Sequence, residues 1–185
     1  VLSQISKYWF EKTKGIVDNH FLTDEVKEYP KPFNQHQELL KGRSMLVKKA
    51  NPFPVECIVR GYLSGSAWKE YQKSHLLFGY TLPDNLQNSS KLPTPLFTPS
   101  TKAESGHDIN ISYEDMQKMV SPEIGRKLKI LSLAIYGAGV QEAEKKGIII
   151  ADTKFEFGLL SHKIFLIYEV LTTDSSRLCT AAKYQ

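Results

Sequence analysis

Three charged residues alternate with apolar residues in the run from Ile148 to Gly158. Side chains of a β-strand point to opposite faces with a period of two, so Asp152, Lys154 and Glu156 would share one face of a strand. The two carboxylates could hold Mg²⁺, and the lysine could neutralise phosphoryl oxygens. A half-exposed hairpin strand with solvated charges would show the same pattern, and this stretch by itself does not decide between the two interpretations.

A second candidate site follows an expected strand at 55–60. Gly61 and Gly65 allow tight turns after Arg60, and Ser66 is placed to cap the helix that follows. A helix start presents free N–H groups and the positive end of the helix dipole, so a phosphate bound there could also contact Arg60 and the Ser66 hydroxyl. The alternative is an ordinary glycine turn before a capped helix, which is the more common meaning of such a pattern.

A third candidate is the polar loop 97–112, which ends a proline-rich stretch from 75 to 100 with little periodic structure. Long loops of this kind in compact domains are usually functional or disordered, and ligand-binding residues concentrate on loops. This loop carries four side chains that could bind a ligand: Lys102, Glu104, His107 and Asp108. A solvated loop remains the alternative.

Strands and helices in mixed order must position these residues. The patterns predict strands at 44–49, 55–60, 148–157 and 164–170. They predict helices at 1–14, from Ser66 through Tyr71, from Ser112, and from Ser121 to a stop at Gly147. Pro52 and Pro54 mark a candidate hinge near 50–55. If 164–170 is the hairpin partner of 148–157, Glu169 would lie near Glu156 across the pair.

Length and composition indicate one globular unit. The 185 residues are 41% apolar and 24% charged, and no apolar run approaches the roughly 18 to 20 residues that span a bilayer. Cys57 and Cys179 lack the spacing of a zinc or redox site and are expected to stay reduced, which favours the cytosol. The net charge of +4 comes from scattered lysines, so we expect anionic small molecules as ligands, and neither nucleic acid nor membrane.

Four motifs, in this order along nearly the whole chain, resemble the SAICAR synthetase (phosphoribosylaminoimidazole-succinocarboxamide synthase) family of purine biosynthesis. They occupy 60–68 (RGYLSGSAW), 97–108 (FTPSTKAESGHD), 151–158 (ADTKFEFG) and 174–177 (DSSR). The resemblance implies an α+β fold, the substrate domain of a two-lobed ATP-grasp-like or kinase-like enzyme, with an antiparallel sheet and flanking helices. It also implies that the carboxylate of phosphoribosyl carboxyaminoimidazole (CAIR) is joined to the amine of L-aspartate through an acyl phosphate. ATP would be consumed in this reaction, and Mg²⁺ would be required.

The resemblance assigns roles to residues of this chain. The CAIR phosphate would be bound by Arg60, Ser66 and Arg177; Mg²⁺ by Glu156 and Glu169; ATP by Glu56, Asp152 and Lys154; and the catalytic groups would be Lys102, Asp108 and Lys154. One departure concerns the pair Tyr168-Glu169, because the family often has Asp-Glu there and one acid is absent from this chain.

Members of this family are longer at both ends. We therefore expect the 185 residues to form a single domain without the N-terminal lobe that covers ATP and without the C-terminal helices, and to make little SAICAR alone. The apolar stripe of the uncapped opening helix would pack beneath such a lobe. A protein kinase is a poor alternative because His-Arg-Asp and Asp-Phe-Gly are both missing. A catalytically silent homologue that binds CAIR or a partner, or a phosphate-ligand binding module, remains open, as does the oligomeric state.

Overall fold

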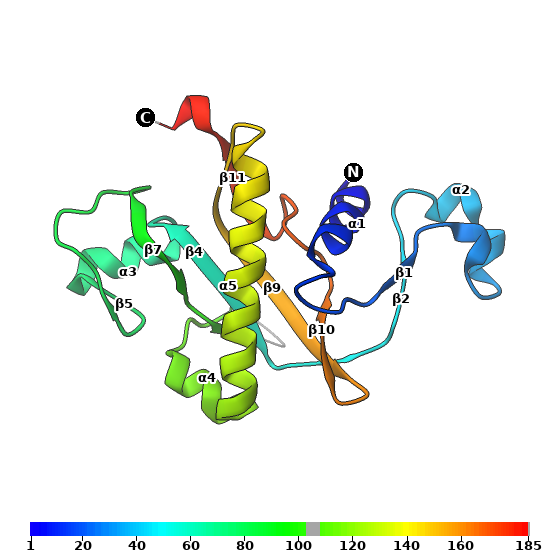
Figure 1. The fold of residues 1–185 in the computed structure, drawn as a ribbon, viewed down its shortest axis with the longest axis horizontal. Helices are drawn as coiled ribbons and strands as arrows, with labels where there is room; N and C mark the ends of the chain where they lie inside the picture. Colours follow the sequence, from blue (N-terminus) through cyan, green and yellow to red (C-terminus); the bar gives the residue numbers. More distant parts are fainter. Residues whose placement is uncertain (103–107, 185) are drawn as a thin grey trace.

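The computed structural model describes residues 1–102 and 108–184. Its centre is an antiparallel sheet of seven strands built around one long strand, β9 (Figure 1). The path through the sheet is β10–β9–β4–β7, with β11 and β3 also paired to β9 and β8 to β4. The strands are β3 (Asn51–Pro52), β4 (Val55–Tyr62), β7 (Lys91–Phe97), β8 (Ser100–Thr101), β9 (Ile148–Leu160), β10 (Lys163–Ile167) and β11 (Ser176–Thr180).

The pairing of β4 with β9 fixes which side chains share a face. Cys57 lies opposite Phe155, and Arg60 lies opposite Asp152. Because neighbouring side chains alternate, Cys57, Val59 and Phe155 point into the hydrophobic core, while the charged residues of both strands share the other face. We call this second face the polar face.

Helix α5 (Pro122–Glu144) covers the core face of the sheet (Figure 1). Its first turn is fixed by Ser121, whose hydroxyl accepts the N–H of Ile124, and by proline at the first helical position. The hydroxyl of Tyr136 donates to the Ile150 carbonyl at 2.7 Å and ties the helix to β9. Beside it packs α4 (Tyr113–Val120), which is capped by Ser112.

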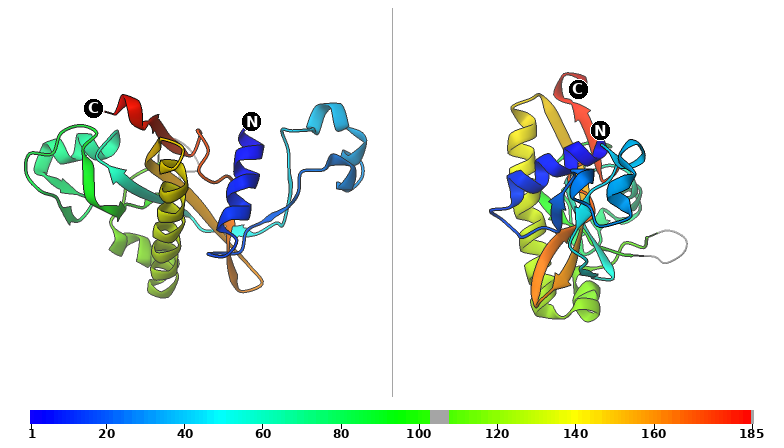
Figure 2. Two further views of the ribbon diagram at one scale, coloured as in Figure 1. Left: turned by 45° about the horizontal axis from the view of Figure 1, so that its top comes forward. Right: turned by 90° about the vertical axis from the view of Figure 1, so that its right-hand side faces the viewer.

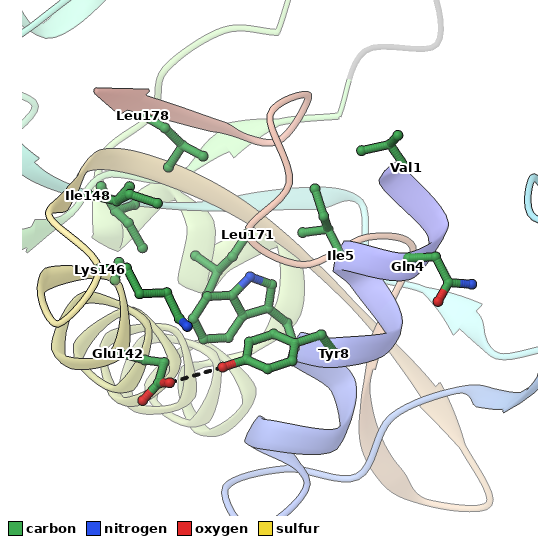
Figure 3. A pocket seen from close by; sticks show the side chains of 12 residues that line it. Val1, Gln4, Ile5, Tyr8, Glu142, Lys146, Ile148, Leu171 and Leu178 are labelled. Carbon is green, nitrogen blue, oxygen red and sulfur yellow. Dashed lines mark hydrogen bonds between the residues drawn. The ribbon is translucent and has the colours of Figure 1, made fainter. Parts of the chain in front are cut away.

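Helix α1 (Leu2–Thr13) joins the same core through Trp9 and Phe10. Between α1, the end of α5 and β9 lies a mostly apolar groove of about 620 Å³ (Figure 3). The Tyr8 hydroxyl donates to the Glu142 carboxylate across it at 3.0 Å. The two chain ends lie toward the same side of the molecule in Figures 1 and 2.

Two smaller units extend from the sheet on opposite sides (Figure 2). One contains β1 (Phe21–Thr23), η1 (Val26–Glu28), η2 (Phe33–Gln35), α2 (Gln37–Leu40) and β2 (Leu46–Val47). The other contains α3 (Ser66–Ser74), β5 (Leu76–Leu77) and β6 (Tyr80–Thr81), and has its own small core around Leu63, Tyr71 and Leu77. The last short helix is η3 (Ala181–Lys183).

The expected α+β class with an antiparallel sheet and flanking helices is confirmed. Three local predictions were wrong. The stretch 75–100 is not without regular structure, because β7 within it pairs with β4. The strand expected at 44–49 is only Leu46–Val47, and the one expected at 164–170 ends at Ile167, since Tyr168 has a φ of 63° and leaves the extended region.

The candidate hinge near 50–55 remains a prediction. In this structure Pro52 lies in β3 opposite Gly158, and the Phe53 N–H donates to the Phe157 carbonyl at 2.9 Å. Among the described residues, no helix combines the length and the apolar character needed to pass through a bilayer.

Candidate functional site

One end of the polar face carries two arginines on a shared carboxylate. Arg60 is 3% exposed, and its guanidinium donates to Thr98 Oγ1 at 2.9 Å, to Ser66 Oγ at 3.2 Å and to Asp152 Oδ2 at 3.4 Å. The pKa of Arg60 is lowered to about 10. Burial is the main cause, the charge of Asp152 opposes it, and the charge of Arg177 adds to it. The group therefore stays charged at neutral pH.

Arg177 reaches the same carboxylate from β11. The register of β11 on β9 puts Arg177 opposite Asp152, and its Nε donates to Asp152 Oδ1 at 2.9 Å while Nη2 pairs with Oδ2. Gly65 makes room for this arginine, because a Cβ at that position would collide with the guanidinium. We call Arg60, Ser66, Asp152 and Arg177 the arginine end. It carries two positive charges and one negative charge and thus suits an anion.

The start of α3 differs from expectation. Ser66 was predicted to cap the helix, but the cap position belongs to Gly65, with φ 59° and ψ −128°, and Ser66 is the first helical residue. Glycine fits here for two reasons, since φ is positive and Arg177 occupies the space of a side chain. The Ser66 hydroxyl accepts from Arg60 instead of capping the helix.

A pocket of about 270 Å³ runs from the arginine end along β9. Its walls come from β4, β9, the segment before β11 and the start of β11: Ile58, Arg60, Asp152, Thr153, Lys154 and residues 173–177. The pocket therefore connects the two arginines with Lys154. This lysine lies two residues after Asp152 on β9 and on the same face of the strand.

The other end of the polar face is built from lysine–glutamate pairs. Lys154 Nζ lies 3.3 Å from Glu56 Oε1 on the neighbouring strand, and Lys102, next to β8, pairs with Glu156. We call Glu56, Lys102, Lys154 and Glu156 the lysine end. Burial raises the pKa of Glu56, and the charge of Lys154 opposes this. Burial lowers the pKa of Lys102, but the hydrogen bond and charge of Glu156 outweigh it, so that the net change is upward.

The two proposed metal ligands are not strand partners. Ile167, not Glu169, lies opposite Glu156, and Glu169 follows the end of β10, where it accepts a hydrogen bond from Thr172. The two acids are therefore not a strand pair, and their nearness to each other remains a prediction. Within residues 1–102 and 108–184, no three His, Cys, Asp or Glu side chains are grouped to hold a metal ion. Two carboxylates suit an Mg²⁺ that takes its other ligands from water and phosphate.

Of the loop residues, Asp108 lies within electrostatic range of Glu56 at the lysine end. Its charge contributes to the raised pKa of Glu56. Glu104 and His107, which the sequence singled out, lie outside the described residues. The structure thus brings Lys102 and Asp108 to the lysine end although the chain between them is not described.

Sequence reasoning missed two side chains of the site. Thr98 is fully buried and accepts from Arg60, and the Tyr168 ring lies under the Lys102 ammonium. Thr98 sits within the motif 97–108, so its position was visible but its partner was not. Tyr168 stands where the family often has an acid, and no local signal in the sequence indicates its contact with Lys102.

Comparison with known proteins agrees with this arrangement of motifs. The family model for SAICAR synthetase matches residues 1–185. The chain belongs to this family. A phosphoribosylaminoimidazole-succinocarboxamide synthase from Thermodesulfovibrio yellowstonii is 57% identical over 185 residues, which are 100% of this chain and 63% of that protein. One from Desulfosudis oleivorans is 54% identical over 178 residues, covering 96% of this chain and 61% of the relative.

Solved structures agree as well. The structure described as SAICAR-synthase from Saccharomyces cerevisiae complexed with SAICAR superposes with a TM-score of 0.87 at 39% identity. The matched region covers 100% of this chain and 63% of the yeast chain. The chain thus spans somewhat less than two thirds of the length of these relatives.

Proposed function

We propose that this chain carries the substrate and phosphoryl-transfer groups of an enzyme that joins the CAIR carboxylate to L-aspartate at the expense of ATP. The observation that carries the proposal is the polar face of β4 and β9, where one pocket runs from the two arginines to Lys154, the first of the lysine–glutamate pairs. The names of the relatives support it, as does the SAICAR complex of the yeast relative. Two free thiols suit a reaction in the cytosol.

At the arginine end, the sugar phosphate of CAIR would bind to Arg177, Arg60 and the Ser66 hydroxyl. Arg177 is the accessible one, with 46% of its side chain exposed, while Arg60 is held from below by Thr98 and Asp152. Guanidinium groups bind phosphate in a bidentate manner that lysine cannot match. Asp152, predicted as an ATP ligand, would orient both arginines toward the phosphate.

At the lysine end, the CAIR carboxylate would attack the γ-phosphorus of ATP. The new P–O bond forms as the bond to the ADP oxygen breaks, and the aspartate amine then displaces phosphate from the acyl phosphate to form the amide. Lys154 and Lys102 would neutralise phosphoryl and carboxylate oxygens, with Glu56 and Asp108 setting the charge around them. Glu156 and Glu169 would hold Mg²⁺, which when bound shields the triphosphate charge.

A hybrid enzyme tests this function. Residues 1–185 of this chain replace the aligned 185-residue segment of the Thermodesulfovibrio relative, so that the rest of that enzyme is kept. With CAIR, aspartate and Mg-ATP, we expect SAICAR formation at a rate within about tenfold of a typical ~10 per second. A folded hybrid that binds CAIR but forms no SAICAR would instead indicate a silent binding module.

A further inference from the structure

Lys102 has a second partner besides Glu156. Its ammonium lies over the ring of Tyr168, 4.4 Å from the ring centroid. An ammonium within about 6 Å of an aromatic face is attracted by the negative potential of the ring. The lysine is therefore held from two sides, by a carboxylate of β9 and by an aromatic ring that follows β10.

Tyr168 is an unusual residue for its place. Its side chain is 59% exposed, so it contributes little to the core, and its φ of 63° lies in the left-handed region. A bulky residue is strained in that region, and such strain concentrates at functional sites. An exposed ring on a strained backbone needs another reason to be there, and its contact with Lys102 supplies one.

The backbone of Tyr168 is held in place. The His20 ring nitrogen Nε2 lies 3.2 Å from the Tyr168 carbonyl oxygen, and the His20 N–H donates to the Leu166 carbonyl at 3.1 Å. His20 itself is 8% exposed and packs on Phe10 of α1. The ring of Tyr168 therefore projects from a backbone segment that His20 ties to the core.

Glu156 has two roles under the proposed function, since it pairs with Lys102 here and would bind Mg²⁺ with ATP. The two cations compete for one carboxylate. A divalent cation is the stronger competitor for oxygen ligands, and Lys102 would lose this partner as the nucleotide binds. The Tyr168 ring is no ligand for Mg²⁺ and would keep its attraction for the ammonium.

We propose that Tyr168 is a positioning residue that holds the Lys102 ammonium at the lysine end, both while Lys102 is paired with Glu156 and after Glu156 has turned to the metal ion. The second half of this proposal rests on the proposed function. The first half rests on the contact alone and is tested without turnover.

The contact is tested by nuclear magnetic resonance on the 185-residue chain with ¹³C-labelled lysine. The ε-CH₂ protons of Lys102, assigned by their loss in Lys102→Arg, should be shifted upfield by the ring. Tyr168→Phe should keep the shift, and Tyr168→Leu should return it to that of an exposed lysine. Lys129, whose ammonium lies 4.6 Å from the Tyr113 ring centroid, is the matched control, and it should respond to Tyr113→Leu only. A Lys102 shift that is absent, or unchanged in Tyr168→Leu, overturns the proposal.

Addition of Mg-ATP tests the second half. The upfield shift of Lys102 should persist when Mg-ATP is added to the hybrid enzyme, while its loss would mean that Lys102 leaves the ring. Because a cation–π contact contributes about 0.5 to 2 kcal/mol, Tyr168→Leu should lower kcat/KM for ATP about 2- to 30-fold, and Tyr168→Phe should restore it. Unchanged kinetics in Tyr168→Leu would overturn the positioning role. If the hybrid itself is inactive, the proposed function fails, and the resonance experiments still decide the contact.

Discussion

The two ends of the polar face use the same strands in different ways. At the arginine end, one carboxylate binds two guanidinium groups, and Arg60 is buried with three hydrogen-bonding partners. At the lysine end, each ammonium group pairs with a separate carboxylate, and neither lysine is buried as Arg60 is, although Arg177 is as exposed as Lys154. One end is therefore fixed by its own contacts, and the other is adjustable.

This difference matches the demands of the proposed reaction. A sugar phosphate keeps its charge throughout, so a preorganised pair of planar guanidinium groups serves it best. The triphosphate and the acyl phosphate change charge and position during the reaction, and lysine, a point charge on a flexible stem, can follow them. The strand β9 thus carries a rigid site at the arginine end and an adjustable one at the lysine end.

The largest expected effect is the loss of stability that follows when the ion pairs of the arginine end are broken. Asp152→Ala leaves the buried Arg60 and its neighbour Arg177 without their shared counter-charge. Removing one partner of a buried ion pair costs about 3 to 5 kcal/mol, so the free energy of unfolding measured in urea should fall by that amount. Glu123→Ala, which breaks an exposed pair with Lys127, is the control and should cost less than about 0.5 kcal/mol. A loss below about 1 kcal/mol in Asp152→Ala would show that the arginine end is not rigid.

The next effect concerns the metal at the lysine end. Mg²⁺ should bind the hybrid enzyme poorly without nucleotide, since two carboxylates leave most of an octahedral shell to water and phosphate. Glu156→Gln should weaken Mg-ATP binding by roughly tenfold, or ~1.4 kcal/mol, in calorimetry. Tight Mg²⁺ binding in the absence of nucleotide, or turnover unchanged by Glu156→Gln, would contradict this role.

A smaller effect is expected for the second pair of the lysine end. Lys154→Met removes a half-exposed ammonium that water already solvates, so its pair with Glu56 contributes less than the buried pair of Arg60 with Asp152. The free energy of unfolding should therefore fall by about 1 kcal/mol or less, well below the loss in Asp152→Ala. Equal losses in these two variants would remove the distinction between the two ends.

The smallest expected effect is a pH dependence of the free energy of unfolding that is caused by protonation of His20. Burial lowers its pKa below the ordinary value of about 6.5, although the Tyr168 carbonyl opposes this. A depressed pKa means that the unfolded chain binds the proton more readily, so stability is full above pH ~6.5 and declines as pH falls toward the folded-state pKa. His20→Gln should remove this part of the decline in urea unfolding curves, while exposed His162→Gln should not. An unchanged pH profile in His20→Gln would contradict it.

The sequence predicted those parts of the polar face that follow from the alternation of residues within one strand. The alternation in 148–158 indicated that Asp152, Lys154 and Glu156 share a face, and the strand before Gly61 placed Arg60 at a turn. Both follow from the period of two along a strand. The resemblance of the motifs to a known family then connected stretches that periodicity treats separately.

What could not be predicted depends on contacts between distant segments. Arg177 meets Asp152 only because β11 pairs with β9 in one register, which includes an irregularity just after Arg177. Gly65 has no room for a side chain because Arg177 fills that space, and Glu169 lies outside the strand pairing because the chain turns at Tyr168. Each of these features is set by tertiary packing, to which local propensity is a weak guide.

The contact of Arg177 with the sugar phosphate is the most direct test of the central claim. A thermodynamic cycle measures it by calorimetry on the 185-residue chain and its Arg177→Ala variant, with CAIR and with the nucleoside that lacks the phosphate. Arg126→Ala, an exposed arginine of α5, serves as the control. Loss of the phosphate should weaken binding to the unmodified chain by about 1.5 to 3 kcal/mol more than binding to Arg177→Ala. If the phosphate contributes equally to both, Arg177 does not bind it, and the arginine end is not the CAIR phosphate site.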